Sequence, residues 1–188
     1  MCRKYTNKMK YSIEKILNTG KSIKYLFFWG HQPSRSGDLT KSCFSQWWES
    51  SFVIDNIEYK TAEHYMMAEK ARLFNNEETR NRIIECKSPA EAKKLGRQVE
   101  NFNQKIWESH SYEIVKTANI HKFNQNESLK TFLTNTKNRV LVEASPVDPI
   151  WGIGMAEDHK DVLNPNKWRG LNLLGFALME VRDELISK

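Results

Sequence analysis

Residues 59–74 read YKTAEHYMMAEKARLF, a stretch that predicts the end of a strand followed by a helix with Thr61 as its N-cap. One face of that helix combines charged and apolar side chains at spacings of four, three and four residues: Glu63, Met67, Lys70 and Phe74. Burying either charge among apolar side chains is costly. The pattern therefore indicates a pocket that uses both charges. The alternative is an ordinary amphipathic helix whose Glu63 and Lys70 extend to solvent at its edge.

The length and composition are those of a soluble globular protein. A chain of 188 residues suits one domain with a proper core. We expect that domain to span residues 25–188, and we expect residues 1–24 to form an N-terminal extension, either an appended helix or a poorly ordered arm. The net charge of +6 favours anionic partners such as phosphates or nucleic acid, although the lysines are scattered along the sequence.

Several function classes are disfavoured by what the sequence lacks. Three cysteines without a CxxC pair argue against a disulfide framework, and the histidines show no metal-ligand spacing, so we expect neither a metal nor a cofactor. GxSxG and Walker A sequences are absent as well. The longest apolar run, Tyr25–Trp29, is too short to span a bilayer, and the N-terminus does not look like a signal peptide. We therefore expect a cytoplasmic protein with no membrane partner.

Local patterns predict a few short strands and many helices. Strands are expected over 25–29 and 139–144, and a hairpin is expected over 52–59, with Asp55–Asn56 as a turn pair that tolerates left-handed backbone. A helix opens near residue 77, and the capping box Ser88–Glu91 starts another. Further helices are expected over 104–123, 127–135 and 170–185. The fold class is a helix-dominated α+β domain.

A second unusual stretch, EASPVDPIWGIG, occupies residues 143–154. Its prolines and glycines disfavour a regular helix or strand in this stretch. Gly152 and Gly154 would let the backbone approach a ligand closely, and Trp151 offers a flat face for stacking. The alternative is a tight turn packed under one tryptophan.

A third stretch, WRGLNLLGFALM, occupies residues 168–179. Gly175 inside a helix costs about 1 kcal/mol relative to alanine, which indicates close packing against another backbone. Asn172 lies in the first turn, where it could hold a phosphate or a ribose hydroxyl or could help to cap the helix.

Together these stretches resemble the NADAR family, which includes YbiA-like proteins. The resemblance covers about residues 25–183 and rests on an ordered series of segments: FWG at 28–30, FSQWW at 44–48, FVIDNIEYKTAEHYMMAEKA at 52–71, LGRQV at 95–99, Trp107, KFNQNESL at 122–129, LVEASPVDPIWGIG at 141–154 and WRGLNLLGFALM at 168–179. Two features depart from the family pattern. Gln46 stands where the family usually has Asn, and the loop at 31–41 is somewhat long.

The resemblance implies an N-glycosidase that acts on a ribosylated, phosphate-bearing substrate, with a YbiA-like fold. Some relatives act on amino-pyrimidine intermediates of riboflavin synthesis, and others remove ADP-ribose from guanine in DNA or RNA. In the second group a lysine is thought to form a Schiff base with the ribose, and the matching residue here is Lys70. The amine must be neutral, so we expect Met66, Met67 and Phe74 to lower its pKa by desolvation. Glu63 is expected to face the sugar and to shuttle protons together with Asp148, and the sequence leaves open which carboxylate acts as acid and which as base.

The same resemblance, together with the stretches above, implies a set of substrate contacts: Phe28, Gly30, Trp47, Trp107, Glu143, Ser145, Trp151, Gly152, Gly154 and Asn172. Arg35, with Lys41, is a candidate for phosphate contact in the polar loop. The competing interpretation is a non-catalytic module that binds ADP-ribose or a nucleotide. The presence of both Glu63 and Lys70 argues against it, because binding alone does not need a buried amine.

Overall fold

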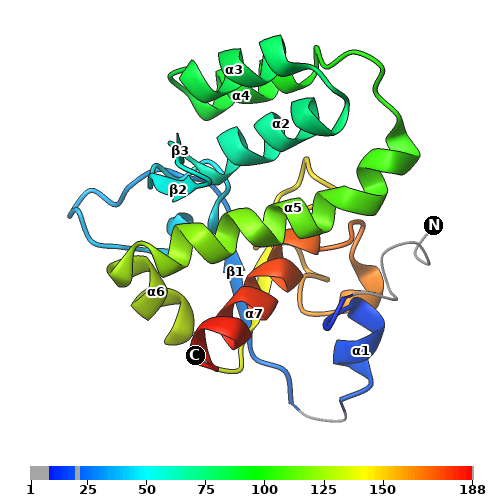
Figure 1. Ribbon diagram of the computed structural model, residues 1–188. Helices are drawn as coiled ribbons and strands as arrows, with labels where there is room; N and C mark the ends of the chain where they lie inside the picture. The colour runs from blue at the N-terminus through cyan, green and yellow to red at the C-terminus, as the bar shows by residue number, and fades with distance from the viewer. Residues whose placement is uncertain (1–8, 20–21, 188) are drawn as a thin grey trace. The chain divides into compact units, whose positions relative to one another are not determined.

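Helices dominate the part of the chain described by this computed structural model, which is residues 9–19 and 22–187. These residues form seven α-helices, two short 3-10 helices and four β-strands (Figure 1). The expected helix-dominated α+β class is therefore confirmed. The chain divides into two compact units, one comprising Met1–Ser45 with Ser128–Lys188 and the other Gln46–Glu127. Each unit is described by itself.

The second unit begins with a β-hairpin. Strands β2 (Phe52–Ile54) and β3 (Ile57–Tyr59) are antiparallel, and Phe52 pairs with Tyr59. The turn residues Asp55 and Asn56 have φ angles of 51° and 61°. This is the left-handed turn that the sequence predicts, because Asp and Asn tolerate positive φ better than most residues.

Helix α2 (Ala62–Leu73) is the central element of the second unit. It contacts β3 and the helices α3 (Glu77–Glu85), α4 (Pro89–Gly96) and α5 (Gln104–Asn124) (Figure 1). Every residue from Ala62 to Glu69 is buried, as is Ala71. An ordinary amphipathic helix leaves one face in solvent. The interpretation of α2 as such a helix, with Glu63 and Lys70 extending to solvent at its edge, is therefore wrong for most of its length.

The predicted cap residues start two of these helices. Thr61 Oγ1 accepts a hydrogen bond from the His64 amide at 3.3 Å. Ser88 Oγ accepts from the Glu91 amide at 3.2 Å, and Pro89 occupies the first helical position. In a capping box the Glu91 carboxylate would accept from the amide of the cap residue, Ser88. Here it accepts instead from the amide of the preceding residue, Lys87, at 3.2 Å.

The first unit is built on a parallel strand pair. Strand β1 (Tyr25–Phe28) pairs with β4 (Val140–Glu143), with Phe28 opposite Glu143. Helix α7 (Leu173–Ile186) packs on β4. The remaining elements are α1 (Ile13–Leu17), the 3-10 helices η1 (Lys41–Phe44) and η2 (Pro165–Lys167), and α6 (Glu127–Thr134).

Helix α7 lies very close to β4 at Gly175. A Cβ atom added at Gly175 would lie 2.1 Å from the Leu141 carbonyl oxygen and 2.6 Å from the Asn172 side chain. The backbone contact inferred from a glycine inside a helix is therefore confirmed.

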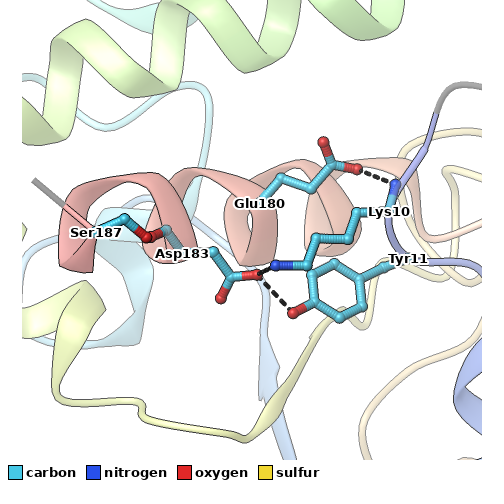
Figure 2. Close-up of polar contacts among 5 residues, drawn as sticks. All are labelled: Lys10, Tyr11, Glu180, Asp183 and Ser187. Carbon is cyan, nitrogen blue, oxygen red and sulfur yellow. Dashed lines mark hydrogen bonds and ion pairs between the residues drawn. The ribbon is translucent and has the colours of Figure 1, made fainter.

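The described part of the N-terminal extension is tied to α7. The Lys10 amide donates to Glu180 Oε1 at 2.8 Å, and the Tyr11 hydroxyl donates to Asp183 Oδ2 at 2.6 Å (Figure 2). Lys10 Nζ forms an ion pair with the same Asp183 oxygen. These contacts favour the appended-helix alternative for residues 9–19, while residues 1–8 and 20–21 of the expected extension lie outside the described residues. None of the helices in the described ranges combines the length and apolarity that crossing a membrane requires.

We predict that Gly175→Ala destabilises the protein by about 2 kcal/mol or more, because the new methyl group meets a backbone carbonyl that cannot rotate away. Alanine normally stabilises a helix interior relative to glycine, so the contact reverses the usual sign. The measurement is the free energy of unfolding from urea denaturation.

The control for this prediction is Gly37→Ala, whose added Cβ would meet nothing within 4 Å. Its φ of +81° should limit the cost to about 1 kcal/mol. A Gly175→Ala protein as stable as the parent would contradict the close contact.

Candidate active site

The amine of Lys70 is held inside the second unit. Lys70 is half-buried near the end of α2, and its Nζ donates to the Gly96 carbonyl at 2.8 Å. The same Nζ lies 4.2 Å from the centroid of the Phe102 ring and 5.8 Å from that of Trp107. The structure therefore brings Trp107, one of the expected contact residues, next to Lys70.

The surroundings of Lys70 favour its neutral form. Burial lowers the pKa of the Lys70 amine below its ordinary value, and the positive charge of Arg97 lowers it further. The aromatic rings act in the opposite sense, since a π face stabilises an ammonium. Burial is the larger of the two causes that lower the pKa, so the surroundings shift Lys70 toward its neutral form.

Close packing of α4 on α2 explains how Gly96 reaches Lys70. A Cβ atom added at Gly96 would lie only 2.2 Å from Met67 Sδ. Glycine thus lets the end of α4 approach the helix that carries Lys70, and it presents a carbonyl to the amine.

The loop that carries Phe102 is clamped to the end of α2. Asn76 Oδ1 accepts from the Glu100 amide at 3.0 Å, while its Nδ2 donates to the Phe74 carbonyl at 2.7 Å. Phe74 also packs edge-on against Phe102, with ring centroids 5.3 Å apart. Phe74 therefore supports the ring that covers Lys70, whereas the sequence suggested that it would desolvate the amine itself.

Three residues around Lys70 were missed by sequence reasoning: Gly96, Arg97 and Phe102. The first two belong to the segment LGRQV, which supports the family resemblance but had no assigned role. Nothing in the spacing along the chain connects this segment with Lys70. The only signal in the sequence was Gly96 itself, because a glycine at the end of a predicted helix can let that helix approach another one closely.

Glu63 is buried, with only 6% of its surface exposed. It lies in the first turn of α2, where the helix dipole stabilises a carboxylate, and its amide donates to the Gln46 carbonyl at 3.0 Å. Seven residues separate it from Lys70, which corresponds to about 10 Å along the helix axis. This separation reduces the conflict between a carboxylate and an amine that must be neutral.

Gln46 makes a polar contact of its own in the second unit. Its Oε1 accepts from Asn119 Nδ2 at 2.8 Å, and both side chains are buried. Among the described residues, Gln46 Nε2 and Asn119 Oδ1 have no hydrogen-bond partner. The neighbouring Trp47 lies under Lys93, whose Nζ is 5.7 Å from its ring.

In the first unit, several expected contact residues gather at the carboxyl ends of the two parallel strands. Phe28 and Glu143 are opposite each other as the last residues of β1 and β4. Gly30 and Ser145 follow within two residues. Phe28 and Ser145 are buried, while Gly30 is exposed with a φ of +81°.

Asp148 organises the loop that follows β4. Its Oδ1 accepts from the amides of Ile150 and Trp151 at 2.9 and 2.8 Å, and its carbonyl accepts from the Gly154 amide at 3.2 Å. The Oδ1 atom of Asp148 is thus fully used in hydrogen bonds within the turn. Trp151 is half-buried and accepts a backbone bond from Leu174 at 3.1 Å.

The two glycines of this loop are required by its backbone conformation. A Cβ atom at Gly152 would lie 2.8 Å from the Glu143 carbonyl, and Gly154 has a φ of +64°. The tight-turn alternative therefore accounts for both glycines. The loop still presents the half-buried ring of Trp151.

Asn172 links β4 to the start of α7. It is fully buried, its Oδ1 accepts from the Glu143 amide at 3.0 Å, and its Nδ2 donates to the Leu141 carbonyl at 2.9 Å. Both polar ends are used on strand backbone, so the side chain neither caps α7 nor points a group at a ligand. We assign it a structural role in place of the expected substrate contact.

The polar loop supplies exposed cations. Arg35 is exposed, whereas Lys41 forms an ion pair with Glu157 at 2.7 Å. No group of three or more His, Cys, Asp and Glu side chains in residues 9–19 and 22–187 is arranged to hold a metal ion.

Comparison with known proteins places nearly the whole chain in one family. A family model described as NADAR domain matches residues 27–186. N-glycosidase R617 of Acanthamoeba polyphaga mimivirus is 43% identical over 166 residues, which are 86% of this chain and 96% of the viral protein. Riboflavin biosynthesis protein PYRR, chloroplastic, of Zea mays is 34% identical over 140 residues, which are 71% of this chain but only 21% of the maize protein.

The fold is shared with a solved structure. N-glycosidase YbiA of Escherichia coli strain K12 is 32% identical over 149 residues, which are 79% of this chain and 81% of that protein. The NMR structure of E. coli YbiA matches with a TM-score of 0.70 and 28% identity, covering 89% of this chain and 88% of that one.

We predict that Arg97→Gln raises the pKa of Lys70, because it removes a positive charge that disfavours the ammonium. The midpoint for reaction of Lys70 with an amine-specific reagent should then move to higher pH, as followed by mass spectrometry of the peptide that contains Lys70. Lys94→Gln removes an exposed charge from α4, the helix that ends just before Arg97, and is the matched control. An equal shift in both variants would show that net charge alone sets the pKa.

Proposed function

This chain belongs to the NADAR family, and we propose from that membership that it is an N-glycosidase, a hydrolase that cleaves the bond between a ribose and the nitrogen of a base. Two relatives, R617 and YbiA, are named N-glycosidases. The observation that carries the proposal is the amine of Lys70, which is half-buried, bonded to the Gly96 carbonyl and lowered in pKa by burial and by Arg97.

The proposed reaction uses Lys70 as a nucleophile. A ribose joined through an exocyclic amine opens its ring to an imine at C1. The neutral amine of Lys70 attacks C1, a C–N bond forms, and the base leaves as a free amine when its own C–N bond breaks. Water then hydrolyses the resulting Schiff base, which releases the sugar and restores Lys70. One water is consumed for each base released.

Glu63 is the proposed proton shuttle. It is buried and belongs to the same helix as Lys70, so packing restricts the positions open to its carboxylate. A positioned acid–base group contributes about 10²- to 10⁴-fold to such a reaction. Asp148 is the second candidate, with only Oδ2 available because Oδ1 is bonded to two amides of its loop.

The substrate is proposed to be ribosylated and to bear phosphate. One class comprises the amino-pyrimidine ribosyl phosphates of riboflavin synthesis, which the name of the maize relative favours. The other is ADP-ribosyl guanine in DNA, RNA or a nucleotide. Aromatic side chains suit stacking on the base in both classes, and those we propose are Trp47, Trp107 and Trp151.

A non-catalytic module that binds ADP-ribose or a nucleotide is the alternative. It would need the aromatic rings and the cations, but it would gain nothing from an amine of lowered pKa. Incubating the protein with ADP-ribosylated guanosine DNA, and separately with the riboflavin intermediate, separates these possibilities. Release of a base from one substrate supports the hydrolase. Tight binding without release from either would favour the binding module.

We predict that borohydride traps a sugar adduct on the wild-type protein and none on Lys70→Ala or Lys70→Arg. The arginine variant keeps the positive charge and most of the side-chain length but lacks a nucleophilic amine. Lys94→Ala is the control for reaction at an exposed lysine. Intact-protein mass spectrometry measures the adduct, and an adduct that survives in both Lys70 variants would refute the Schiff base.

We predict that Glu63→Gln lowers kcat by about 10²- to 10⁴-fold, because the amide keeps the shape of the side chain but cannot transfer a proton. Substrate affinity should change little. Glu58→Gln on the exposed side of β3 is the matched control and should retain full activity. A Glu63→Gln enzyme with undiminished kcat would remove Glu63 from the mechanism.

A further inference from the structure

A pocket with no assigned role lies within the second unit, at the end of α2 opposite to Lys70. Its volume is about 340 Å³, and it is lined by six residues with polar or charged side chains and by one proline: Glu49, Ser50, Ser51, Lys60, Thr61, Lys87 and Pro89. This volume is within the lower range of small-molecule sites. Thr61 and Lys70 are nine residues apart, or about 14 Å along the helix, so a group in this pocket is not the group that reacts with Lys70.

The pocket holds two cations against one carboxylate. Lys60 Nζ donates to the carbonyls of Glu85 and Cys86, which fixes the ammonium at the edge of the pocket. Those bonds use two of its three donors. Lys87 is exposed, as is Glu49, so the lining has a net charge of +1.

Two helices begin at this pocket. Thr61, the N-cap of α2, is part of its lining, and so are Lys87 and Pro89 on either side of Ser88, the N-cap of α4. The N-terminus of a helix carries a partial positive charge. The two helix ends add to the field of the lysines and favour an anion, although the Glu91 carboxylate at the start of α4 already accepts from the Lys87 amide at 3.2 Å.

Ser50 supplies an independent indication of a ligand. Its hydroxyl oxygen is buried, and it has no hydrogen-bond partner among the described residues. A buried polar group without a partner is uncommon and costs stability. Ser50 lines the pocket, and rotation about its χ1 angle redirects the hydroxyl without moving the backbone.

We propose that this pocket binds a phosphate group. Phosphate presents several acceptor oxygens, and the lining offers ammonium and hydroxyl donors in a positive field. The site goes beyond the proposed hydrolysis, because it lies away from Lys70 and does not depend on the chemistry at that residue. Its test is a binding measurement, so failure here would leave the proposed N-glycosidase untouched.

The first experiment titrates inorganic phosphate into the ¹⁵N-labelled full chain at constant ionic strength. The amide signals of Ser50, Ser51, Thr61 and Lys87 should shift together and saturate. Adenosine 5′-monophosphate should produce the same shifts and adenosine should not, if the phosphate group is what the pocket recognises. Shifts that grow linearly, or that spread over lysines throughout the chain, would overturn the proposal.

Three variants are expected to weaken, strengthen and leave unchanged the binding of phosphate. Lys87→Ala should weaken phosphate binding by roughly fivefold, because it removes one charged donor at a partly solvated site. Glu49→Gln should strengthen binding, since it removes the only negative charge of the lining. Lys94→Ala, an exposed lysine of α4 outside the lining, should bind phosphate as the parent does.

Ser50→Ala separates binding from folding. The hydroxyl has no hydrogen bond to lose, so the variant should be at least as stable as the parent in urea, yet it should bind phosphate more weakly. Unchanged affinity in Ser50→Ala together with equal losses in Lys87→Ala and Lys94→Ala would reduce the effect to general charge attraction and refute the site.

Discussion

The burial of helix α2 is the constraint on which the second unit depends. A helix enclosed on nearly every side cannot keep a charged side chain without compensation. Glu63 is placed at the positive end of the helix dipole, and Lys70 donates to the Gly96 carbonyl under the ring of Phe102. The contacts that allow the amine to lie inside are also the surroundings that lower its pKa. The packing of Lys70 and the lowering of its pKa therefore have the same cause.

The first unit depends on a different constraint, the approach of one backbone to another. Gly175 lets α7 lie against Leu141, and Gly152 lets the loop after β4 fold back on Glu143. Asn172 then joins the strand to the helix through two side-chain hydrogen bonds. These contacts position the backbone of the loop that carries Trp151, whose ring is half-buried. They also explain why this stretch is so rich in glycine.

Helix α2 has chemically different ends. Its N-terminus meets the pocket between Lys60 and Lys87, where the helix dipole and the ammonium groups favour an anion. Its last turns carry a lysine whose surroundings disfavour the charged form. The second unit thus contains two lysines that line a pocket and a third lysine whose pKa is lowered by burial.

Local features of this protein were determined by the sequence alone. The left-handed turn at Asp55–Asn56 and the helix start at Ser88 each follow from the backbone preferences of a few adjacent residues. The ordered motifs were also sufficient to indicate the family. These signals survive in any tertiary context, because they depend on φ and ψ and on hydrogen bonds between near neighbours.

Only the tertiary structure decided which charges are buried and what surrounds them. The Gly96 carbonyl that accepts from Lys70 is 26 residues away in the chain, and Phe102 is farther still. Asn172, which the sequence suggested as a ligand contact or a cap, instead bonds a strand about 30 residues before it. Burial and pKa depend on atoms brought together from distant parts of the chain, and periodicity within one helix does not contain that information.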